Sequence, residues 1–451
     1  MRRLFGTDGI RGIANEFLDC ERAMAIGRAL GHVISSNHKY RPKVLIGMDT
    51  RISSPMLASA ISAGLLSVGS DVLDLGVIPT PAVAYLVKKY KAKAGVMISA
   101  SHNTYEYNGI KIFGEDGFKL SDELEEQIES IVLDGVPKIK LSESNRIGKK
   151  CDMPYGLHDY ITHLMQTTDT PLDGIKVAID ASNGAASITA GELFSSLGVD
   201  AHVIFDKPDG ININEKCGST NIDALKKYVV ENKMDLGIAF DGDADRCLAV
   251  DELGREIDGD FIMAILALDM KRRGELFKST VVGTVMTNLG FQKFCTENDI
   301  NFMAAKVGDR YVLELMNQEG YSFGGEQSGH IILRKHATTG DGQLTAVALL
   351  SIIAESGSTL SELASIMKKY PQYMVNIAAT QNQKIALFTD EEIKAILAEA
   401  ESKLGKRGRI VTRPSGTEPL IRIMVEYDNA DEIRGFCEDI AERIKARLLD
   451  Y

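Results

Sequence analysis

A serine at the end of an apolar segment is the side chain best suited to covalent chemistry in this sequence. Residues 94–100 predict a buried strand that stops abruptly at the polar residues Ser101, His102 and Asn103. A serine hydroxyl is a weak nucleophile and needs a nearby base, a cation or a reactive donor. Lys111 follows within a short distance along the chain. The pattern favours a serine that takes part in phosphoryl transfer, with an ordinary polar turn as the alternative.

Three aspartates on alternate positions form a second candidate site. Asp241, Asp243 and Asp245 follow the strand-like segment 234–240, and Arg246 comes next. Carboxylates this close repel one another by roughly 1–4 kcal/mol per pair, which a hard divalent cation relieves. An EF-hand calcium loop is excluded, because its sixth position needs glycine and this chain has Arg246 there. The spacing favours metal binding over a solvated acidic turn.

Two more polar loops have the composition of ligand-binding loops. Residues 324–330 place Glu326, Ser328 and His330 among glycines, which suits close approach to a polyhydroxylated ligand, and histidine titrates near neutral pH. Residues 413–419 combine an arginine, two hydroxyls and a glycine between two strand-like runs, as in a phosphate cradle. Taken alone, the glycine-rich loop is more often an ordinary turn, and a surface turn is also the alternative for residues 413–419.

Composition limits the class of protein. The 451 residues are 44% hydrophobic and 25% charged, as in ordinary globular proteins of about three domains. A formal net charge of -12 argues against general attraction to nucleic acid or to an anionic membrane. The six cysteines are far apart and show no metal-type spacing, which suits reduced thiols. With no apolar export segment and no apolar run of membrane-spanning length, we expect a cytoplasmic protein without nucleic-acid or membrane partners.

Recurring strand–helix–strand patterns predict three similar α/β domains with parallel or mixed sheets, followed by a smaller α+β domain. In the last part of the chain, Thr389 to Glu392 predicts a capping box, and apolar residues recur at helical spacing from Ile433. The predicted domains, each with one of the polar loops, are residues 1–153, 154–254, 255–368 and 369–451.

In their order along the chain, these loops resemble those of the alpha-D-phosphohexomutase superfamily. The resemblance rests on residues 5–12, 47–51, 101–103, 241–246, 307–310, 324–330 and 413–419. It implies a four-domain, heart-shaped enzyme in which every domain contributes one loop to a central cleft.

The resemblance also implies a role for each loop. The first would carry a phosphoryl group on a serine, the second would hold one Mg²⁺ together with that phosphoserine, the third would bind the sugar, and the fourth would grip the distal phosphate. The implied catalytic residues are Ser101, Lys111, His330 and Arg11; the metal ligands Ser101, Asp241, Asp243 and Asp245; the substrate-binding residues Glu326, Ser328, Arg246, Arg51 and His102; and the phosphate-binding residues Arg413, Ser415, Gly416, Thr417 and Arg422.

The implied reaction moves a phosphate between O6 and O1 of a sugar through a bisphosphorylated intermediate, which also serves as the activator. The resemblance of residues 324–330 and 338–342 favours hexosamine phosphates as substrates, because hexose mutases of the superfamily usually carry Met where this chain has Gln327. The product would feed UDP-N-acetylglucosamine and cell-wall precursors, and a homodimer is the family expectation. Thr104 and Tyr107 depart from the usual Pro and Asp, a change that we expect activity to survive.

Three other interpretations remain open. One is a hexose-phosphate mutase of the same superfamily. Another is a phosphatase with Asp241 as nucleophile, which would leave the Ser101 and Arg413 loops unexplained. The last is a sugar-phosphate sensor without catalysis.

Overall fold

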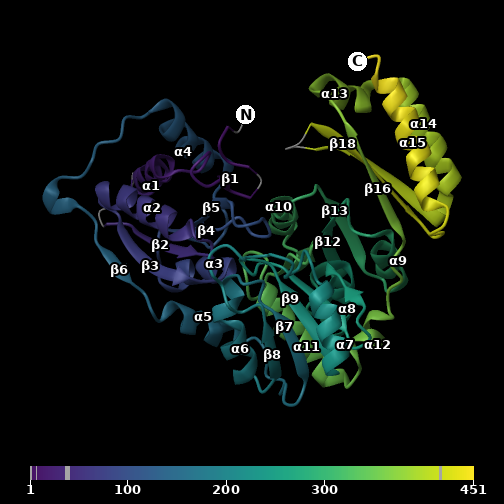
Figure 1. Ribbon diagram of the computed structural model, residues 1–451, viewed down its shortest axis with the longest axis horizontal. Coiled ribbons are helices and arrows are strands. Elements are labelled where there is room, and N and C mark those ends of the chain that lie inside the picture. Colours follow the sequence, from purple (N-terminus) through teal and green to yellow (C-terminus); the bar gives the residue numbers. More distant parts are fainter. Residues whose placement is uncertain (1–2, 7, 36–40, 416–418) are drawn as a thin grey trace. The chain divides into compact units, whose positions relative to one another are not determined.

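The computed structural model describes residues 3–6, 8–35, 41–415 and 419–451 (Figure 1). The chain forms two compact units. The first contains Met1–Thr284 and Met303–Ile366, and the second contains Val285–Phe302 and Met367–Tyr451.

The first sheet contains the strand that precedes Ser101. Its order is β1-β5-β4-β2-β3-β6, in which β4, β2, β3 and β6 run parallel and β5 runs antiparallel to both of its neighbours. Apolar residues of the central strands and the flanking helices form one buried core. The strands are β1 (Ile10–Ile13), β2 (Lys43–Met48), β3 (Asp71–Val77), β4 (Ala94–Ile98), β5 (Tyr107–Gly114) and β6 (Lys150–Asp152); the helices are α1 (Cys20–Ser35), α2 (Ser54–Ser67), α3 (Thr80–Lys89) and α4 (Asp122–Asp134).

The second sheet follows the same plan. Its order is β11-β10-β9-β7-β8, with parallel pairing in the β9-β7-β8 part and antiparallel pairing of β10 with β9 and β11. The elements are α5 (Gly156–Met165), β7 (Lys176–Asp180), α6 (Ala190–Ser196), β8 (Asp200–Ile204), α7 (Asp223–Asn232), β9 (Leu236–Phe240), β10 (Cys247–Asp251) and β11 (Glu256–Ile257).

The third sheet is smaller and again mixed. Its order is β13-β12-β14-β15, with β12 parallel to β14 and β14 antiparallel to β15. The elements are α8 (Gly259–Arg272), β12 (Thr280–Thr284), α9 (Leu289–Glu297), β13 (Asn301–Ala305), α10 (Asp309–Glu319), β14 (Phe323–Gly325), β15 (Ile331–Leu333), α11 (Gly342–Ser356) and α12 (Leu360–Ala364). The predicted fold class of α/β domains with mixed sheets is confirmed, whereas the exact domain boundaries stay a prediction.

The second unit contains a three-stranded antiparallel sheet, β16-β18-β17, and two long helices that lie side by side in Figure 1. Ile433, Ile440 and Ile444 are buried, as their helical spacing predicts. The predicted capping box is wrong in detail: Thr389 ends one helix, and Asp390 caps the next by accepting the N–H of Ile393. The elements are β16 (Gln372–Ala378), α13 (Gln381–Thr389), α14 (Glu391–Leu404), β17 (Gly408–Pro414), β18 (Leu420–Tyr427) and α15 (Ile433–Leu448).

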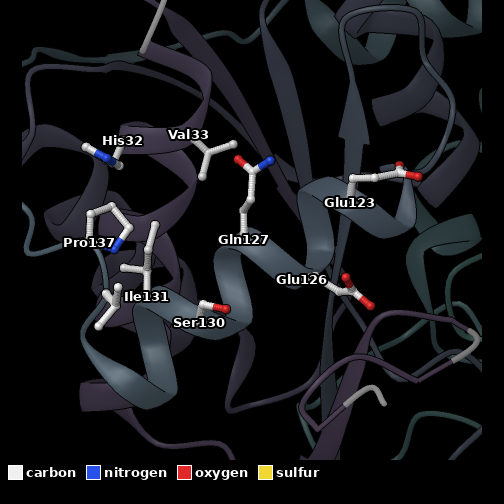
Figure 2. Close-up of a pocket in the computed structure, with 9 residues that line it drawn as sticks. His32, Val33, Glu123, Glu126, Gln127, Ser130, Ile131 and Pro137 are labelled. Carbon is white, nitrogen blue, oxygen red and sulfur yellow. The ribbon is translucent and has the colours of Figure 1, made fainter.

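A surface hollow lies between α1 and α4, where His32 and Val33 face a row of α4 side chains that includes Glu126, Gln127 and Ile131 (Figure 2). All six cysteines are free thiols. Among the described residues, no helix has the length and apolar character needed to cross a bilayer.

Glycines let α1 and α2 approach closely. A Cβ atom on Gly64 would lie 2.2 Å from the carbonyl oxygen of Met24, so we expect Gly64→Ala to push the helices apart and to lower the free energy of unfolding by about 1–3 kcal/mol. Gly191→Ala in α6 is the matched control, because its Cβ meets nothing within 4 Å, and it should be neutral or slightly stabilising. Urea denaturation followed by circular dichroism measures both. Equal stability of the two variants would contradict the proposed close approach.

Candidate active site

Ser101 lies in the connection between β4 and β5, where the chain turns back as an antiparallel hairpin. Its φ of 53° is in the left-handed region, which is unfavourable for a residue other than glycine. Its N–H donates to Ser99 Oγ at 2.9 Å, and its own Oγ donates to Asp241 Oδ2 at 2.5 Å. The candidate nucleophile is buried and points at the acidic loop.

Arg51 holds this loop in place. Its guanidinium, fully buried, donates from Nε to Asp49 at 2.7 Å and from Nη1 and Nη2 to four carbonyl oxygens of the loop. These carbonyls belong to Ser101, Asn103, Thr104 and Tyr107. All five N–H groups of the guanidinium are therefore engaged with the protein. That Arg51 contacts substrate stays a prediction; in this structure its donors are engaged with the loop backbone and Asp49, which makes it a clamp on the loop.

A second clamp comes from the next domain along the chain. Asn214 Nδ2 donates to the carbonyl oxygens of Ser101 and Asn103, at 2.9 Å each. Gly242 lies so close that a Cβ atom there would be 2.6 Å from the Ser101 carbonyl oxygen. The serine loop and the aspartate loop are thus packed backbone against backbone.

The three predicted metal ligands meet in one place. Oxygen atoms of Asp241, Asp243 and Asp245 lie within 4.8 Å of one another, and all three side chains are buried. Burial, together with the charges of Asp245 and Asp243, raises the pKa of Asp241 to about 8. Oδ1 of Asp243 and Oδ1 of Asp245 have no hydrogen-bond partner in the part of the chain that the structure describes. A buried, all-oxygen donor set with unsatisfied carboxylate oxygens fits a hard divalent cation such as Mg²⁺.

Both predicted proton carriers lie beside this triad. Lys111, on β5, has its Nζ 2.8 Å from Asp243 Oδ2 and 3.2 Å from Asp245 Oδ2. Burial would lower the pKa of Lys111, but the neighbouring carboxylates outweigh it and hold this pKa well above its ordinary value. His330 Nδ1 lies 3.6 Å from Asp245 Oδ1, and this carboxylate raises the pKa of His330 against the effect of burial.

Two guanidiniums lie near the serine loop and the triad. Arg11 donates to the Asn103 side chain at 3.2 Å, and Arg246 Nε lies 4.0 Å from carboxylate oxygens of the triad. Burial, and then Arg246 and Arg11, lower the pKa of His102 to about 4. Nε of Arg246 has no hydrogen-bond partner among the described residues. These two guanidiniums suit a doubly charged phosphoryl group on Ser101.

The third loop connects β14 and β15, again as an antiparallel hairpin. Glu326 accepts the N–H of Gly308 at 3.1 Å, and burial raises its pKa. Ser328 Oγ is buried without a hydrogen-bond partner within the described ranges. Gln327, by contrast, donates to Asp258 at 3.2 Å, so its amide supports the cap of α8. The sequence singled out Gln327 as a mark of sugar preference, but its side chain is engaged in the scaffold.

The fourth loop lies in the second unit, between β17 and β18. Arg413 and Arg422 stand directly opposite each other on these strands, and burial and the charge of Arg422 lower the pKa of Arg413. Lys384, on α13, donates to the carbonyl oxygen of Ser415 at 2.7 Å. Three cationic side chains thus gather at one loop end, as expected for an anion site. The other two predicted members, Gly416 and Thr417, lie outside the described residues.

Several residues of this neighbourhood were not among the predicted site residues. Thr80 Oγ1 donates to Asp243 Oδ2 at 2.5 Å, and Asp8 Oδ2 lies 3.1 Å from Lys111 Nζ. Lys119 bridges Asp8 and Asp309. Asp8 lies within residues 5–12, one of the segments that carry the family resemblance, so the sequence could have identified it as a site residue. Lys119 carries no sequence signal, because its partners are far away along the chain.

Family models cover nearly the whole chain. The model described as phosphoglucomutase/phosphomannomutase, alpha/beta/alpha domain I, matches residues 2–136; domain II matches residues 158–254, domain III residues 258–370 and the C-terminal domain residues 374–443.

Curated relatives are similar from end to end. Phosphoglucosamine mutase from Acetivibrio thermocellus is 50% identical over 448 residues, which is 99% of this chain and 100% of the relative. The protein of the same name from Clostridium acetobutylicum is 50% identical over 447 residues, with the same coverage of both chains.

Solved structures share the fold. A phosphoglucomutase/phosphomannomutase family protein from Burkholderia thailandensis has a TM-score of 0.82 at 21% identity, covering 99% of this chain and 98% of that one. N-acetylphosphoglucosamine mutase from Aspergillus fumigatus, in complex with GlcNAc-6P and magnesium, has a TM-score of 0.69 at 17% identity, covering 99% and 96% of the two chains.

The clamp role of Arg51 is open to test by Arg51→Lys. Lysine keeps the charge but has three donors on one atom, so it cannot reach four carbonyls and Asp49 at once. We expect a loss of about 1–3 kcal/mol in the free energy of unfolding and faster amide hydrogen exchange in a peptide covering residues 99–108. Arg255→Lys is the control, because the Arg255 side chain is 59% exposed and, among the described residues, forms an ion pair with Asp251 alone. If both variants exchange as the unaltered chain does, Arg51 does not hold the loop.

Proposed function

We propose that this chain, which belongs to the phosphoglucosamine mutase family of the phosphohexomutase superfamily, interconverts glucosamine 6-phosphate and glucosamine 1-phosphate through a phosphorylated Ser101. As a member of this family, the protein is an isomerase. The observation that carries the proposal is the buried Ser101 hydroxyl, which donates to the Asp241 carboxylate within an acidic triad while Arg51 holds the Ser101 carbonyl oxygen.

The reaction runs as two phosphoryl transfers. In the first, the bond between Ser101 Oγ and phosphorus breaks while a bond forms between phosphorus and the free sugar oxygen, giving a bisphosphorylated sugar. Lys111 and His330 are the candidates at the triad to pass the proton from and to the sugar oxygen. Because the neighbouring carboxylates raise the pKa of Lys111, it serves as the proton donor, and neutral His330 is the candidate acceptor of the hydroxyl proton. The bisphosphate then turns over and returns its other phosphate to Ser101, which restores the phosphorylated enzyme.

The acidic triad is the proposed Mg²⁺ site, with the phosphate on Ser101 as the further ligand. When bound, the cation neutralises charge on the phosphoryl oxygens during transfer. Asp243 and Asp245 would offer the cation their Oδ1 atoms, which have no hydrogen-bond partner among the described residues. Before phosphorylation, Asp241 accepts the hydrogen bond of the Ser101 hydroxyl. Arg11 lies beside Asn103 of the serine loop and Arg246 lies beside the triad, so both are proposed to bind the phosphate on Ser101.

Substrate recognition is divided between two loops. Glu326 and Ser328 are the proposed partners of the sugar hydroxyls, and Ser328 Oγ is one of the buried polar atoms without a partner among the described residues. The Arg413 and Arg422 pair, with Ser415 and the residues 416–417, is the proposed grip on the phosphate that is not being transferred.

The remaining proposals concern the activator, the assembly and the location of the enzyme. We propose a bisphosphorylated sugar as the activator that keeps Ser101 loaded, a homodimer as the assembly, and the cytoplasm as the location. The free cysteine thiols support a reducing compartment.

Substitution of the nucleophile tests the mechanism. Ser101→Ala removes the atom that carries the phosphoryl group, so turnover of glucosamine 6-phosphate should fall by at least about 10³-fold while the fold is kept. Coupled detection of glucosamine 1-phosphate measures the rate, and intact-protein mass spectrometry measures the phosphate on the unaltered chain. The matched control is Ser182→Ala, in a buried turn with positive φ that is not one of the proposed site loops. Near-normal turnover by Ser101→Ala would favour the alternative in which Asp241 is the nucleophile.

Substrate preference tests the assignment within the superfamily. We expect kcat/KM for glucosamine 6-phosphate to exceed the values for glucose 6-phosphate and mannose 6-phosphate by at least about 10-fold, equivalent to 1.4 kcal/mol of transition-state binding. The three substrates are compared at equal Mg²⁺ and bisphosphate concentrations. A preference for either hexose phosphate would make the chain a hexose-phosphate mutase instead.

A further inference from the structure

Six charged side chains form a closed ring beside the acidic triad. In order they are Lys111, Asp8, Lys119, Asp309, His330 and Asp245, so that basic and acidic groups alternate all the way round. Lys111 Nζ lies 3.1 Å from Asp8 and 3.2 Å from Asp245, while the ring nitrogens of His330 lie 3.7 Å from Asp309 and 3.6 Å from Asp245. The ring contains both proposed proton carriers.

Lys119 closes the ring on the side away from the triad. It follows β5, and its Nζ pairs at once with Asp8 Oδ1 and with Asp309 Oδ2, the first residue of α10. Its side chain is only 12% exposed, so the two pairs are little screened by solvent. Of the three basic members, Lys119 is the one that forms no ion pair with the triad among the described residues.

Each carboxylate that Lys119 holds touches one proton carrier. The other oxygen of Asp8 lies against Lys111, and the Asp309 oxygen that Lys119 binds also faces His330 Nε2. Without Lys119, Asp8 keeps Lys111 and Arg11 as cations, whereas His330 is the only basic side chain in the described part of the chain that still pairs with Asp309. His330 Nε2 accepts the N–H of Gly340 at 3.1 Å, so loss of Lys119 leaves this nitrogen one backbone contact beside a carboxylate that no other cation among the described residues neutralises.

We propose that Lys119 is a positioning residue for phosphoryl transfer, which sets the places of Lys111 and His330 through Asp8 and Asp309. The inference rests on the proposed function, in which these two groups move the sugar proton. A displacement of about 1 Å in a reacting group costs about 10²-fold in rate, so a residue that fixes two of them at once has a large effect without touching substrate.

The neighbouring residue Arg310 supplies a matched control. It joins the same two segments as Lys119 does, by pairing with Asp122 and Glu125 of α4, but within the described ranges its side chain forms no ion pair with a member of the ring. Its side chain is 11% exposed, close to the value for Lys119. Loss of either residue therefore removes a buried ionic link between the segments, and only one of the two losses opens the ring.

The test compares Lys119→Met, Lys119→Arg and Arg310→Met. Activity is measured on whichever sugar 6-phosphate the unaltered chain uses best, so the amino-sugar assignment does not affect the result. We expect kcat of Lys119→Met to fall about 10²-fold with KM changed by less than about 3-fold, and Lys119→Arg to recover most of the loss. Arg310→Met should lose a comparable amount of thermal stability while its kcat stays within about 3-fold of the unaltered value.

Two outcomes overturn the proposal. One is an unchanged kcat in Lys119→Met. The other is an equal loss of kcat in Lys119→Met and Arg310→Met, which would mean that Lys119 only stabilises the contact between the two segments. Mass spectrometry of Ser101 separates this failure from failure of the proposed function. A chain that never carries phosphate on Ser101 overturns the proposed function, whereas a phosphorylated Lys119→Met chain with normal turnover overturns only the role of Lys119.

Discussion

The buried guanidinium of Arg51 is the constraint on which the candidate active site depends. It ties four carbonyl oxygens of one loop to the Asp49 carboxylate, and in doing so it keeps Ser101 in a left-handed backbone conformation that serine does not favour. Because the clamp grips backbone atoms, it is indifferent to the exposed side chains of Thr104 and Tyr107. The two positions at which the sequence departs from the usual superfamily residues contribute carbonyls, which every residue has.

The candidate loops share one structural setting. The loops that carry Ser101, Asp241 and Glu326 each connect two antiparallel neighbours within a sheet whose other strands are mostly parallel. The returning strand brings a side chain back beside the loop, which is how Lys111 on β5 reaches the aspartate triad. Burial of so many charges is tolerable because opposite charges alternate, as in the ring that contains Lys111 and His330.

Local features could be predicted from the sequence, and long-range ones could not. The strands before Ser101 and Asp241 and the metal-binding spacing are set by residues close together in the chain, and the mixed α/β fold class follows from the same patterns. The hydrogen bonds of Arg51 and the ion pairs of Lys119 join residues that are far apart along the chain, so no local sequence pattern predicts them. Gln327 shows the same limit, since its sequence marks the subfamily while its contact with Asp258, 69 residues away along the chain, follows no local pattern.

The contacts of Arg51 determine which conformation the serine loop has when Ser101 carries no phosphate. Its partners are carbonyl oxygens and Asp49, so the shape of the serine loop owes nothing to an ester at the hydroxyl. Under the proposed mechanism, a molecule whose bisphosphate escaped midway would be left dephosphorylated, yet Ser101 would stay buried in the same loop conformation. Such a molecule would be inactive but intact, and binding of a bisphosphate would be enough to phosphorylate it again without any refolding of the loop.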